Sequence, residues 1–349
     1  MKHIAIIAGD GIGVDVTREA VKVFERAEKV YDFKLEMTHF DWGAEKYLTE
    51  GVTMPEGSLE MFKNEYDAIF AGAFGDPRVP DMKHAADILL GLRFGLDLYI
   101  NLRPVKPLHN NLIPLKGRTT ADVNFVVFRE NTEGMYVNVG GIFKKGTAEE
   151  IALQEDVNTR RGVERIIVAA FEYARKHGRK RVTMADKSNV LRYGHDLWQR
   201  TFAEVAMRYP EIENNTQFVD ATTMWMVLKP DQFDVIVTNN MFGDIITDLG
   251  ASLQGGLGMA ASGNIHPGKV SLFEPVHGSA PKYAGKNVTN PIGAILTAAM
   301  LLDYIGYSEA ANGIEKAVID CLAVGKMTRD IGGGLSTTDM GDAICEAMK

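Results

Sequence analysis

Short apolar runs, each followed by residues at helical spacing, recur along the chain and constrain its fold more than any other feature. Ile4–Ala8 leads through a glycine-rich turn into a helical pattern, and similar runs occur at 66–73, 125–128, 181–185 and 233–237. Strands that alternate with helices predict an α/β fold with a largely parallel sheet. A length of 349 residues predicts two domains, because one domain takes roughly 150 residues.

Composition excludes several classes of protein. The net charge of −8 argues against a nucleic-acid surface, and the basic run 175–181 reads as the exposed end of a helix. No apolar run reaches membrane-spanning length and no leader pattern precedes the first strand, so we expect a cytoplasmic protein. Cys321 and Cys345 show neither a metal-binding spacing nor a disulfide framework.

The turn Gly9-Asp-Gly-Ile-Gly13 has the spacing G-x-G-x-G, whereas a dinucleotide-binding Rossmann turn has G-x-G-x-x-G. No acidic residue follows on a second strand at the expected distance, so we predict no Rossmann site. Two interpretations stay open: a tight turn with close packing of strand on helix, or a backbone surface for part of a cofactor.

Asp244 and Asp248 lie four residues apart in the helical pattern after the run 233–237, which places two carboxylates on one helix face. Oxygen ligands on a rigid element suit Mg²⁺ or Mn²⁺. The alternative is an exposed acidic helix start that favours the helix dipole.

Arg93, Arg103 and Arg129 stand at the ends of apolar elements. Guanidinium groups bind carboxylates through paired hydrogen bonds, so the three could clamp an acidic substrate, although unrelated surface ion pairs would give the same pattern. Lys187 follows the strand 181–185. A lysine there is usually exposed, but in a closed pocket beside a metal its pKa can fall and it can act as a base.

Six motifs together resemble the β-decarboxylating dehydrogenases, the family of the isopropylmalate, isocitrate, homoisocitrate and tartrate or D-malate dehydrogenases. They occur in the family's order over essentially the whole chain: Gly9–Gly13, Leu98–Pro104, Arg129–Tyr136, Asp186–Val190, Asn240–Asp248 and Glu274–Pro281. Each motif is weak alone, but the six in order identify the family.

The resemblance implies two α/β domains that share a large mixed sheet, not a Rossmann fold. A large cofactor-side domain would comprise 1–99 and 253–349. A small domain for dimerisation, metal and substrate would comprise 100–252, with a hairpin or arm at 137–155 that clasps a partner.

The resemblance also implies the reaction, in which a 2-hydroxy acid is oxidised by NAD or NADP and then loses a carboxylate as CO₂. Arg93, Arg103 and Arg129 would bind the substrate carboxylates, Lys187 would be the base and Tyr136 the acid. Asp244 and Asp248 would hold Mg²⁺ or Mn²⁺ together with Asp220 of the partner subunit. The enzyme would therefore be a homodimer with shared active sites, because Lys187 also crosses the interface in this family.

Cofactor binding in the family uses a loop rather than a Rossmann turn. The matching residues here are Ile12, Glu274, His277, Gly278, Ser279, Ala280, Lys282, Tyr283 and Asn290. Lys282-Tyr283 resembles the NADP-using members, because a cation and a phenol suit a 2′-phosphate. The segment Ser336–Asp342, however, lacks the further Tyr and Arg of those enzymes, so both cofactors stay open.

Substrate choice depends on the helix before Arg93. Isocitrate enzymes offer Ser and Asn where this chain has Asp87 and Leu89, and Leu89 with Leu90 suits an alkyl group. We therefore expect a 3-isopropylmalate-type substrate, with isocitrate, homoisocitrate and tartrate or D-malate as alternatives. A non-catalytic regulatory subunit and a metal-dependent lyase without redox chemistry are the alternatives of another class.

Overall fold

The computed structural model describes residues 1–349, which divide into two compact units. Unit 1 contains Met1–Leu98, Arg103–Val123 and Ala251–Lys349, and unit 2 contains Tyr99–Leu102 and Asn124–Gly250. Residues 103–123, which we had placed in the second domain, thus group with the termini. Two elements run across the division, β4 (Ile100–Val105) and α8 (Asn240–Leu253).

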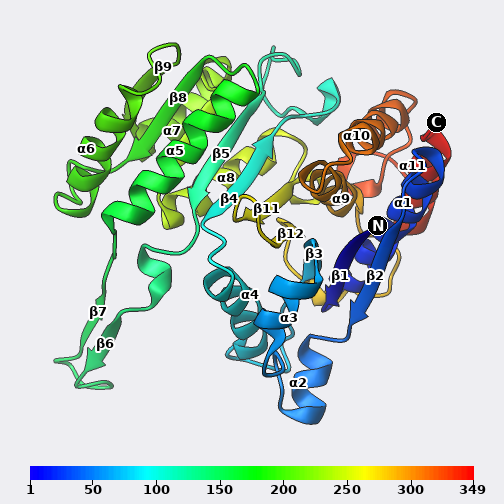
Figure 1. Ribbon diagram of the computed structural model, residues 1–349, viewed down its shortest axis with the longest axis horizontal. Helices are drawn as coiled ribbons and strands as arrows, with labels where there is room; N and C mark the ends of the chain where they lie inside the picture. Colours follow the sequence, from blue (N-terminus) through cyan, green and yellow to red (C-terminus); the bar gives the residue numbers. More distant parts are fainter. The chain divides into compact units, whose positions relative to one another are not determined.

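Unit 1 contains a mixed set of strands in the order β2-β1-β3-β12-β11. β1 (Lys2–Gly9) pairs in parallel with β2 (Leu35–Phe40) and with β3 (Ala68–Ala73). β12 (Ser271–Pro275) is parallel to β3 and antiparallel to β11 (Ala261–Ile265). Its helices are α1 (Ile12–Val30), α2 (Ala44–Glu50), α3 (Ser58–Glu65), α4 (Lys83–Gly95), α9 (Ile292–Tyr304), α10 (Ser308–Ala323) and α11 (Thr337–Ala347) (Figure 1).

Unit 2 contains parallel strands in the order β5-β10-β8-β9. They are β5 (Phe125–Glu130), β10 (Val235–Thr238), β8 (Arg181–Asp186) and β9 (Glu213–Phe218), with helices α5 (Arg160–Lys176), α6 (Gly194–Ala206) and α7 (Val219–Leu228) besides α8. The predicted arm is an antiparallel hairpin of β6 (Gly140–Phe143) and β7 (Ile151–Gln154), which projects from the strands of unit 2 in Figure 1.

Six single turns of 3-10 helix complete the chain: Asn110–Leu112, Met135–Val137, Pro230–Gln232, Leu257–Met259, Pro281–Tyr283 and Arg329–Ile331. No helix combines the length and the apolar character that crossing a membrane requires.

The predicted α/β class and mixed sheet are confirmed, and so are most of the predicted elements. The apolar stripe of α1 is fully buried, and most of the side chains of α9 are buried as well. A helix that is apolar all round is buried on all sides, which fits the packing of α9 against α1, α10, β11 and β12.

Other elements escaped prediction because their sequences carry weak local signals. β9 has the polar sequence Glu-Asn-Asn-Thr-Gln-Phe and is the last strand in its order. Most of its side chains are exposed, so an apolar pattern is not required there. The glycine-rich stretch 252–262 carries no local strand signal, but β11 begins at Ala261.

Close packing accounts for the glycines of the turn at 9–13. A Cβ on Gly13 would lie 2.5 Å from the Ala73 nitrogen and 2.6 Å from the Ala8 oxygen, so the start of α1 contacts two strands directly. Gly11 has φ +57°, and its Cβ would lie 2.2 Å from the Ser279 carbonyl oxygen. The first of the two interpretations is therefore supported by the structure.

Replacement of Gly13 by alanine should destabilise the protein by about 1–3 kcal/mol, because the new methyl meets backbone atoms that cannot move aside. Chemical denaturation of Gly13→Ala measures this. Gly334→Ala is the matched control, since a Cβ there meets nothing within 4 Å. Equal stability of the two variants would contradict the packing explanation.

Candidate functional site

The carboxyl ends of the parallel strands in unit 2 collect the polar residues that the sequence singled out. Arg129 lies near the end of β5, Lys187 follows β8, and α8 begins two residues after β10. Ligand sites of α/β proteins lie at this edge of the sheet.

Arg129 brings three of the predicted residues together. Its guanidinium is buried, with 1% of the side chain exposed, and Nη1 lies 2.5 Å from Oδ1 of Asp244. The Tyr136 hydroxyl donates to Oδ2 of the same carboxylate at 3.1 Å. The Arg129 guanidinium carbon lies 5.1 Å from the centre of the Tyr136 ring, so a guanidinium, a carboxylate and a phenol form one cluster.

Two residues that sequence reasoning missed complete this cluster. Asn240 Oδ1 accepts hydrogen bonds from Nε and Nη2 of Arg129 at 3.0 and 2.8 Å. A Cβ on Gly243 would lie 2.4 Å from the Arg129 Cγ, so only glycine lets α8 approach this side chain. Both belong to the motif Asn240–Asp248, which was the available signal.

Asp248 lies one helical turn after Asp244 on α8. The Asp244 carboxylate is 42% exposed, so a hydrated cation can reach it. The ligands that Asp244 and Asp248 offer to a metal ion are all carboxylate oxygens, which fit a hard cation such as Mg²⁺ or Mn²⁺. No group of three or more His, Cys, Asp or Glu side chains within the chain is placed to hold a metal ion.

Lys187 and Asp220 form a second pair in unit 2. Lys187 Nζ lies 2.5 Å from Asp220 Oδ1, and the hydrogen bond from this ammonium holds the pKa of Asp220 below its usual value. The ammonium also lies 5.6 Å from the centre of the Phe218 ring. The Lys187 backbone N–H donates to Nδ1 of the buried His195 at 3.0 Å. This hydrogen bond orients the start of the loop between β8 and α6.

Glu130 is a buried acid that sequence reasoning also missed. Its side chain accepts from the Thr132 N–H at 2.9 Å, the Thr132 hydroxyl at 2.8 Å and the Glu133 N–H at 2.8 Å. Burial raises its pKa to about 7, against the opposing effect of these hydrogen bonds. The signal was a charged residue at the end of β5, directly after the apolar run 125–128 and Arg129.

In unit 1, the predicted substrate residue Arg93 pairs with the predicted cofactor residue Glu274. Arg93 Nη2 lies 2.9 Å from Glu274 Oε1, which also accepts from Asn264 Nδ2 at 2.9 Å. Leu89 and Leu90 are partly exposed on α4, four and three residues before Arg93, and so share its face. Arg103 is buried on β4.

The predicted cofactor loop meets the glycine turn within unit 1. The Ile12 N–H donates to the Ser279 carbonyl at 2.8 Å. His277 is buried, its Nδ1 lies 3.1 Å from the Gly278 oxygen, and its Nε2 has no hydrogen-bond partner. Burial lowers the pKa of His277, so the ring is neutral at pH 7. An unpaired buried nitrogen fits a site that receives a polar group of a cofactor.

The remaining loop residues differ in exposure. A Cβ on Gly278 would meet nothing within 4 Å, and Ala280 has φ +35°. Lys282 Nζ lies 4.8 Å from the centre of the exposed Tyr283 ring. Asn290 is buried and accepts from the Ile292 N–H at 3.0 Å, at the start of α9.

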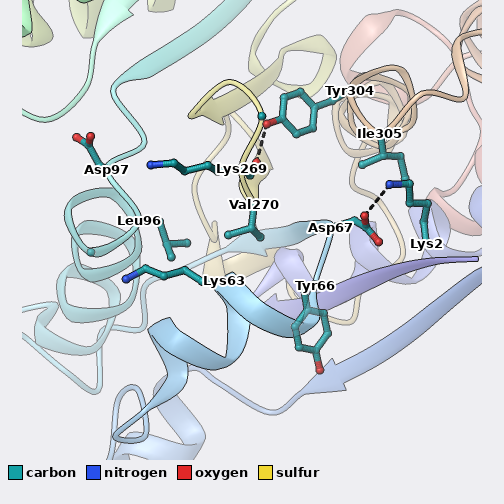
Figure 2. A pocket seen from close by; sticks show the side chains of 12 residues that line it. Lys2, Lys63, Tyr66, Asp67, Leu96, Asp97, Lys269, Val270, Tyr304 and Ile305 are labelled. Carbon is teal, nitrogen blue, oxygen red and sulfur yellow. Dashed lines mark hydrogen bonds and ion pairs between the residues drawn. The ribbon is translucent and has the colours of Figure 1, made fainter.

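A separate pocket of about 800 Å³ in unit 1 involves none of these residues (Figure 2). It includes Lys2 at the start of β1 and Asp67 just before β3, paired at 2.7 Å. These are the amino ends of the strands, whereas the glycine turn follows the carboxyl end of β1.

Comparisons with known proteins agree with this arrangement. The chain is similar to the 3-isopropylmalate dehydrogenase of Thermobifida fusca, with 44% identity over 345 residues, 98% of this chain and 96% of the relative. It is 45% identical to that of Mycobacterium tuberculosis over 347 residues, 99% of each. The crystal structure of isocitrate dehydrogenase from Methylococcus capsulatus superposes with a TM-score of 0.90 at 37% identity, covering 100% of this chain and 99% of that one.

The family model described as isocitrate/isopropylmalate dehydrogenase matches residues 3–344. With the two relatives and the shared fold, this match confirms the resemblance seen in the six motifs: the chain belongs to the isocitrate/isopropylmalate dehydrogenase family.

Proposed function

We propose that the chain catalyses the oxidative decarboxylation of a 3-isopropylmalate-type 2-hydroxy acid with NAD or NADP and a divalent cation. The observation that carries the proposal is the cluster of Arg129, Tyr136 and Asp244, which joins a carboxylate binder, a proton donor and a cation ligand. The relatives named 3-isopropylmalate dehydrogenase support this choice of substrate.

The residues act in sequence on the substrate. Arg93, Arg103 and Arg129 bind its carboxylates through charge-assisted hydrogen bonds. Lys187 takes the proton of the C2 hydroxyl, and C2 becomes a ketone. A bound NAD or NADP would supply the acceptor for the C2 hydride. The C3 carboxylate then leaves as CO₂, its bonding electrons form an enolate over C2 and C3, and Tyr136 donates a proton to C3 so that the C2 ketone is restored.

A divalent cation bound by Asp244 and Asp248 would supply positive charge beside the C2 oxygen and the C1 carboxylate, where negative charge develops. Mg²⁺ usually takes one or two protein carboxylates and fills its other positions with water and substrate oxygens. Two aspartates of α8 suit this requirement, with Asp220 of a second copy as a further ligand.

The shared site rests on the pairing of Lys187. Within the chain its ammonium bonds to Asp220 rather than to the Arg129–Asp244 cluster. We infer that a second copy supplies Lys187 and Asp220 to the aspartates of α8. A catalytic base must lie within hydrogen-bond reach of the proton that it takes.

Exposed apolar side chains in unit 2 support an interface between copies. α7 exposes Met224, Trp225, Val227 and Leu228, and α8 exposes Ile245 at 55%. The hairpin exposes Ile142, Phe143, Ile151 and Leu153. Several large apolar side chains exposed on one element mark a contact with another molecule, so we assign α7, α8 and the hairpin to the dimer.

Substrate choice rests on Leu89 and Leu90 on the Arg93 face of α4. Asp87 is engaged by Lys83 at 2.6 Å and by the Thr53 hydroxyl at 3.2 Å, so its carboxylate is already paired. An alkyl group on C3 gains on the order of 2 kcal/mol when buried against leucine side chains.

The class of function is tested by absorbance at 340 nm with each cofactor, Mg²⁺ and a panel of 2-hydroxy acids. We expect reduced cofactor and CO₂ in equal amounts with 3-isopropylmalate. Release of CO₂ without reduced cofactor would select a lyase, and no turnover with any acid would select a regulatory subunit. All proposed catalytic groups are present, which favours the enzyme.

Removal of the base should stop turnover without unfolding the protein. We expect Lys187→Ala to lower kcat by about a thousand-fold, since a positioned base contributes factors of this order. Lys316→Ala is the control, because Lys316 pairs with Asp320 at 2.7 Å on an exposed helix face far along the chain. A kcat for Lys187→Ala near that of the control would refute the assignment.

Truncation of a leucine on α4 should weaken selection for the alkyl group. Leu90→Ala is expected to lower kcat/KM for 3-isopropylmalate by roughly thirty-fold, the equivalent of about 2 kcal/mol, and to affect D-malate much less. Val324→Ala, at a position 73% exposed, controls for general effects. An equal loss with both acids would remove Leu90 from the alkyl pocket.

Lys282 should decide between the cofactors. If its ammonium binds a 2′-phosphate, Lys282→Ala raises KM for NADP by about ten-fold, because a charge-assisted hydrogen bond is lost, and leaves KM for NAD unchanged. Lys286→Ala, an exposed lysine of the same loop, is the control. A parallel change in both KM values would show that Lys282 does not read the phosphate.

A further inference from the structure

We propose that Glu130 is a positioning residue for Tyr136: its buried carboxylate gathers the backbone of the loop that carries the phenol and fixes where the phenol meets Asp244. This inference rests on the proposed role of Tyr136 as the acid. Glu130 touches neither Tyr136 nor Asp244 in the structure's hydrogen bonds, so it acts through the loop.

The first step is the convergence of three donors on one carboxylate. The N–H and hydroxyl of Thr132 donate to Oε1 of Glu130, and the N–H of Glu133 donates to Oε2. Arg165 Nη2 donates to the Thr132 oxygen at 2.7 Å, so the hydroxyl proton must point at Glu130. Only an acceptor on both oxygens satisfies this arrangement, and glutamine would turn an NH₂ group toward a donor.

The second step connects this turn to Tyr136. The Glu133 carboxylate accepts from the Thr159 N–H at 2.8 Å and from the Thr159 hydroxyl, at the first residue before α5. The Glu133 carbonyl accepts from Asn240 Nδ2 at 3.1 Å. The Gly134 N–H then donates to the Val157 carbonyl at 2.8 Å. Two residues later comes Tyr136, so few rotatable bonds separate the anchored backbone from the phenol.

The third step is the direction in which the side chains point. Successive residues of a strand point to opposite faces. Arg129 therefore reaches α8, where it bonds to Asn240 and Asp244, while Glu130 faces the side of Arg165 on α5. Arg165 also stacks on Tyr99, with its guanidinium carbon 4.3 Å from the ring centre. The loop 131–136 thus begins directly after two side chains, Arg129 and Glu130, that point to opposite faces of β5.

Burial of the Glu130 carboxylate costs free energy of folding, which its hydrogen bonds offset only in part. We infer that this cost is retained because the carboxylate orders the loop. Only 2% of the residue is exposed, and burial raises the pKa of Glu130 to about 7. A buried carboxylate that accepts three hydrogen bonds orders a loop more strictly than an apolar residue of similar size. Measurements at pH 8.5 keep this carboxylate ionised, because the pH then exceeds the raised pKa.

A double-mutant cycle tests the proposal. Displacement of a catalytic group by about 1 Å can cost up to roughly a hundred-fold in rate. We expect Glu130→Gln to lower kcat by about ten- to a hundred-fold at pH 8.5, with little change in KM for the hydroxy acid. In a Tyr136→Phe background, Glu130→Gln should lower kcat less than about two-fold, since the residue acts through Tyr136.

The control is Asp234→Asn. Asp234 accepts from the Lys180 and Arg181 N–H groups at 2.9 and 3.2 Å, before the start of β10 and at the opposite strand ends from Tyr136. It should lower kcat equally in both backgrounds, if at all. An equal loss from Glu130→Gln in both backgrounds, or no loss in either, would overturn the proposal.

A readout independent of activity separates this inference from the proposed function. Amide hydrogen exchange of 131–137 should speed up in Glu130→Gln and stay unchanged in Asp234→Asn. Unchanged exchange would overturn the positioning role, whereas full kcat in Tyr136→Phe alone would overturn only the assignment of Tyr136 as the acid. If Glu130→Gln does not fold, Thr132→Val removes one donor and the Arg165 contact and should give the same changes, smaller in size.

Discussion

The burial of the Arg129 guanidinium is the constraint on which the site in unit 2 depends. An unpaired charge at 1% exposure would cost several kcal/mol, so the structure must provide acceptors around it. α8 provides them as Asn240 and Asp244, and Gly243 lets the helix come close enough. The same ion pair therefore fixes the helix, orients an aspartate and brings Tyr136 to it.

In unit 1, close backbone contacts position the predicted cofactor loop. The turn after β1 approaches the loop that carries Ser279, and the contact requires glycine at position 11. His277, buried and neutral with an unpaired Nε2, lies two residues before Ser279. We infer that the chain binds its cofactor with a loop against a packed turn, which differs from the way a Rossmann turn presents its backbone to a dinucleotide.

Local patterns predicted many of the elements and site residues, because apolar periodicity and motifs are formed by residues close together in the sequence. Asp244 and Asp248 were placed on one helix face from their spacing alone. The pairing of Arg129 with Asp244 joins residues 115 positions apart, which no local pattern encodes. Asn240 and Gly243 were missed for the same reason, since their roles depend on Arg129 from another element. Glu130 bonds to its near neighbours Thr132 and Glu133, but its burial depends on the tertiary structure.

Strand β9 and residues 103–123 show a different limit. β9 is polar along most of its length, so its parallel pairing with β8 is set by the tertiary structure and not by its own composition. Residues 103–123 begin within β4 and continue beyond it without a strong pattern, and their grouping with unit 1 depends on contacts with distant segments.

The central claim is that a second copy completes each site with Lys187 and Asp220. Complementation between two inactive variants, Lys187→Ala and Asp244→Asn, tests it most directly. In a mixed dimer one site would combine an intact Asp244 with an intact Lys187, so random pairing should restore about a quarter of the wild-type kcat per chain. Each variant alone should stay inactive. Mixed dimers that are no more active than either parent would show that each site belongs to a single chain and would contradict the account.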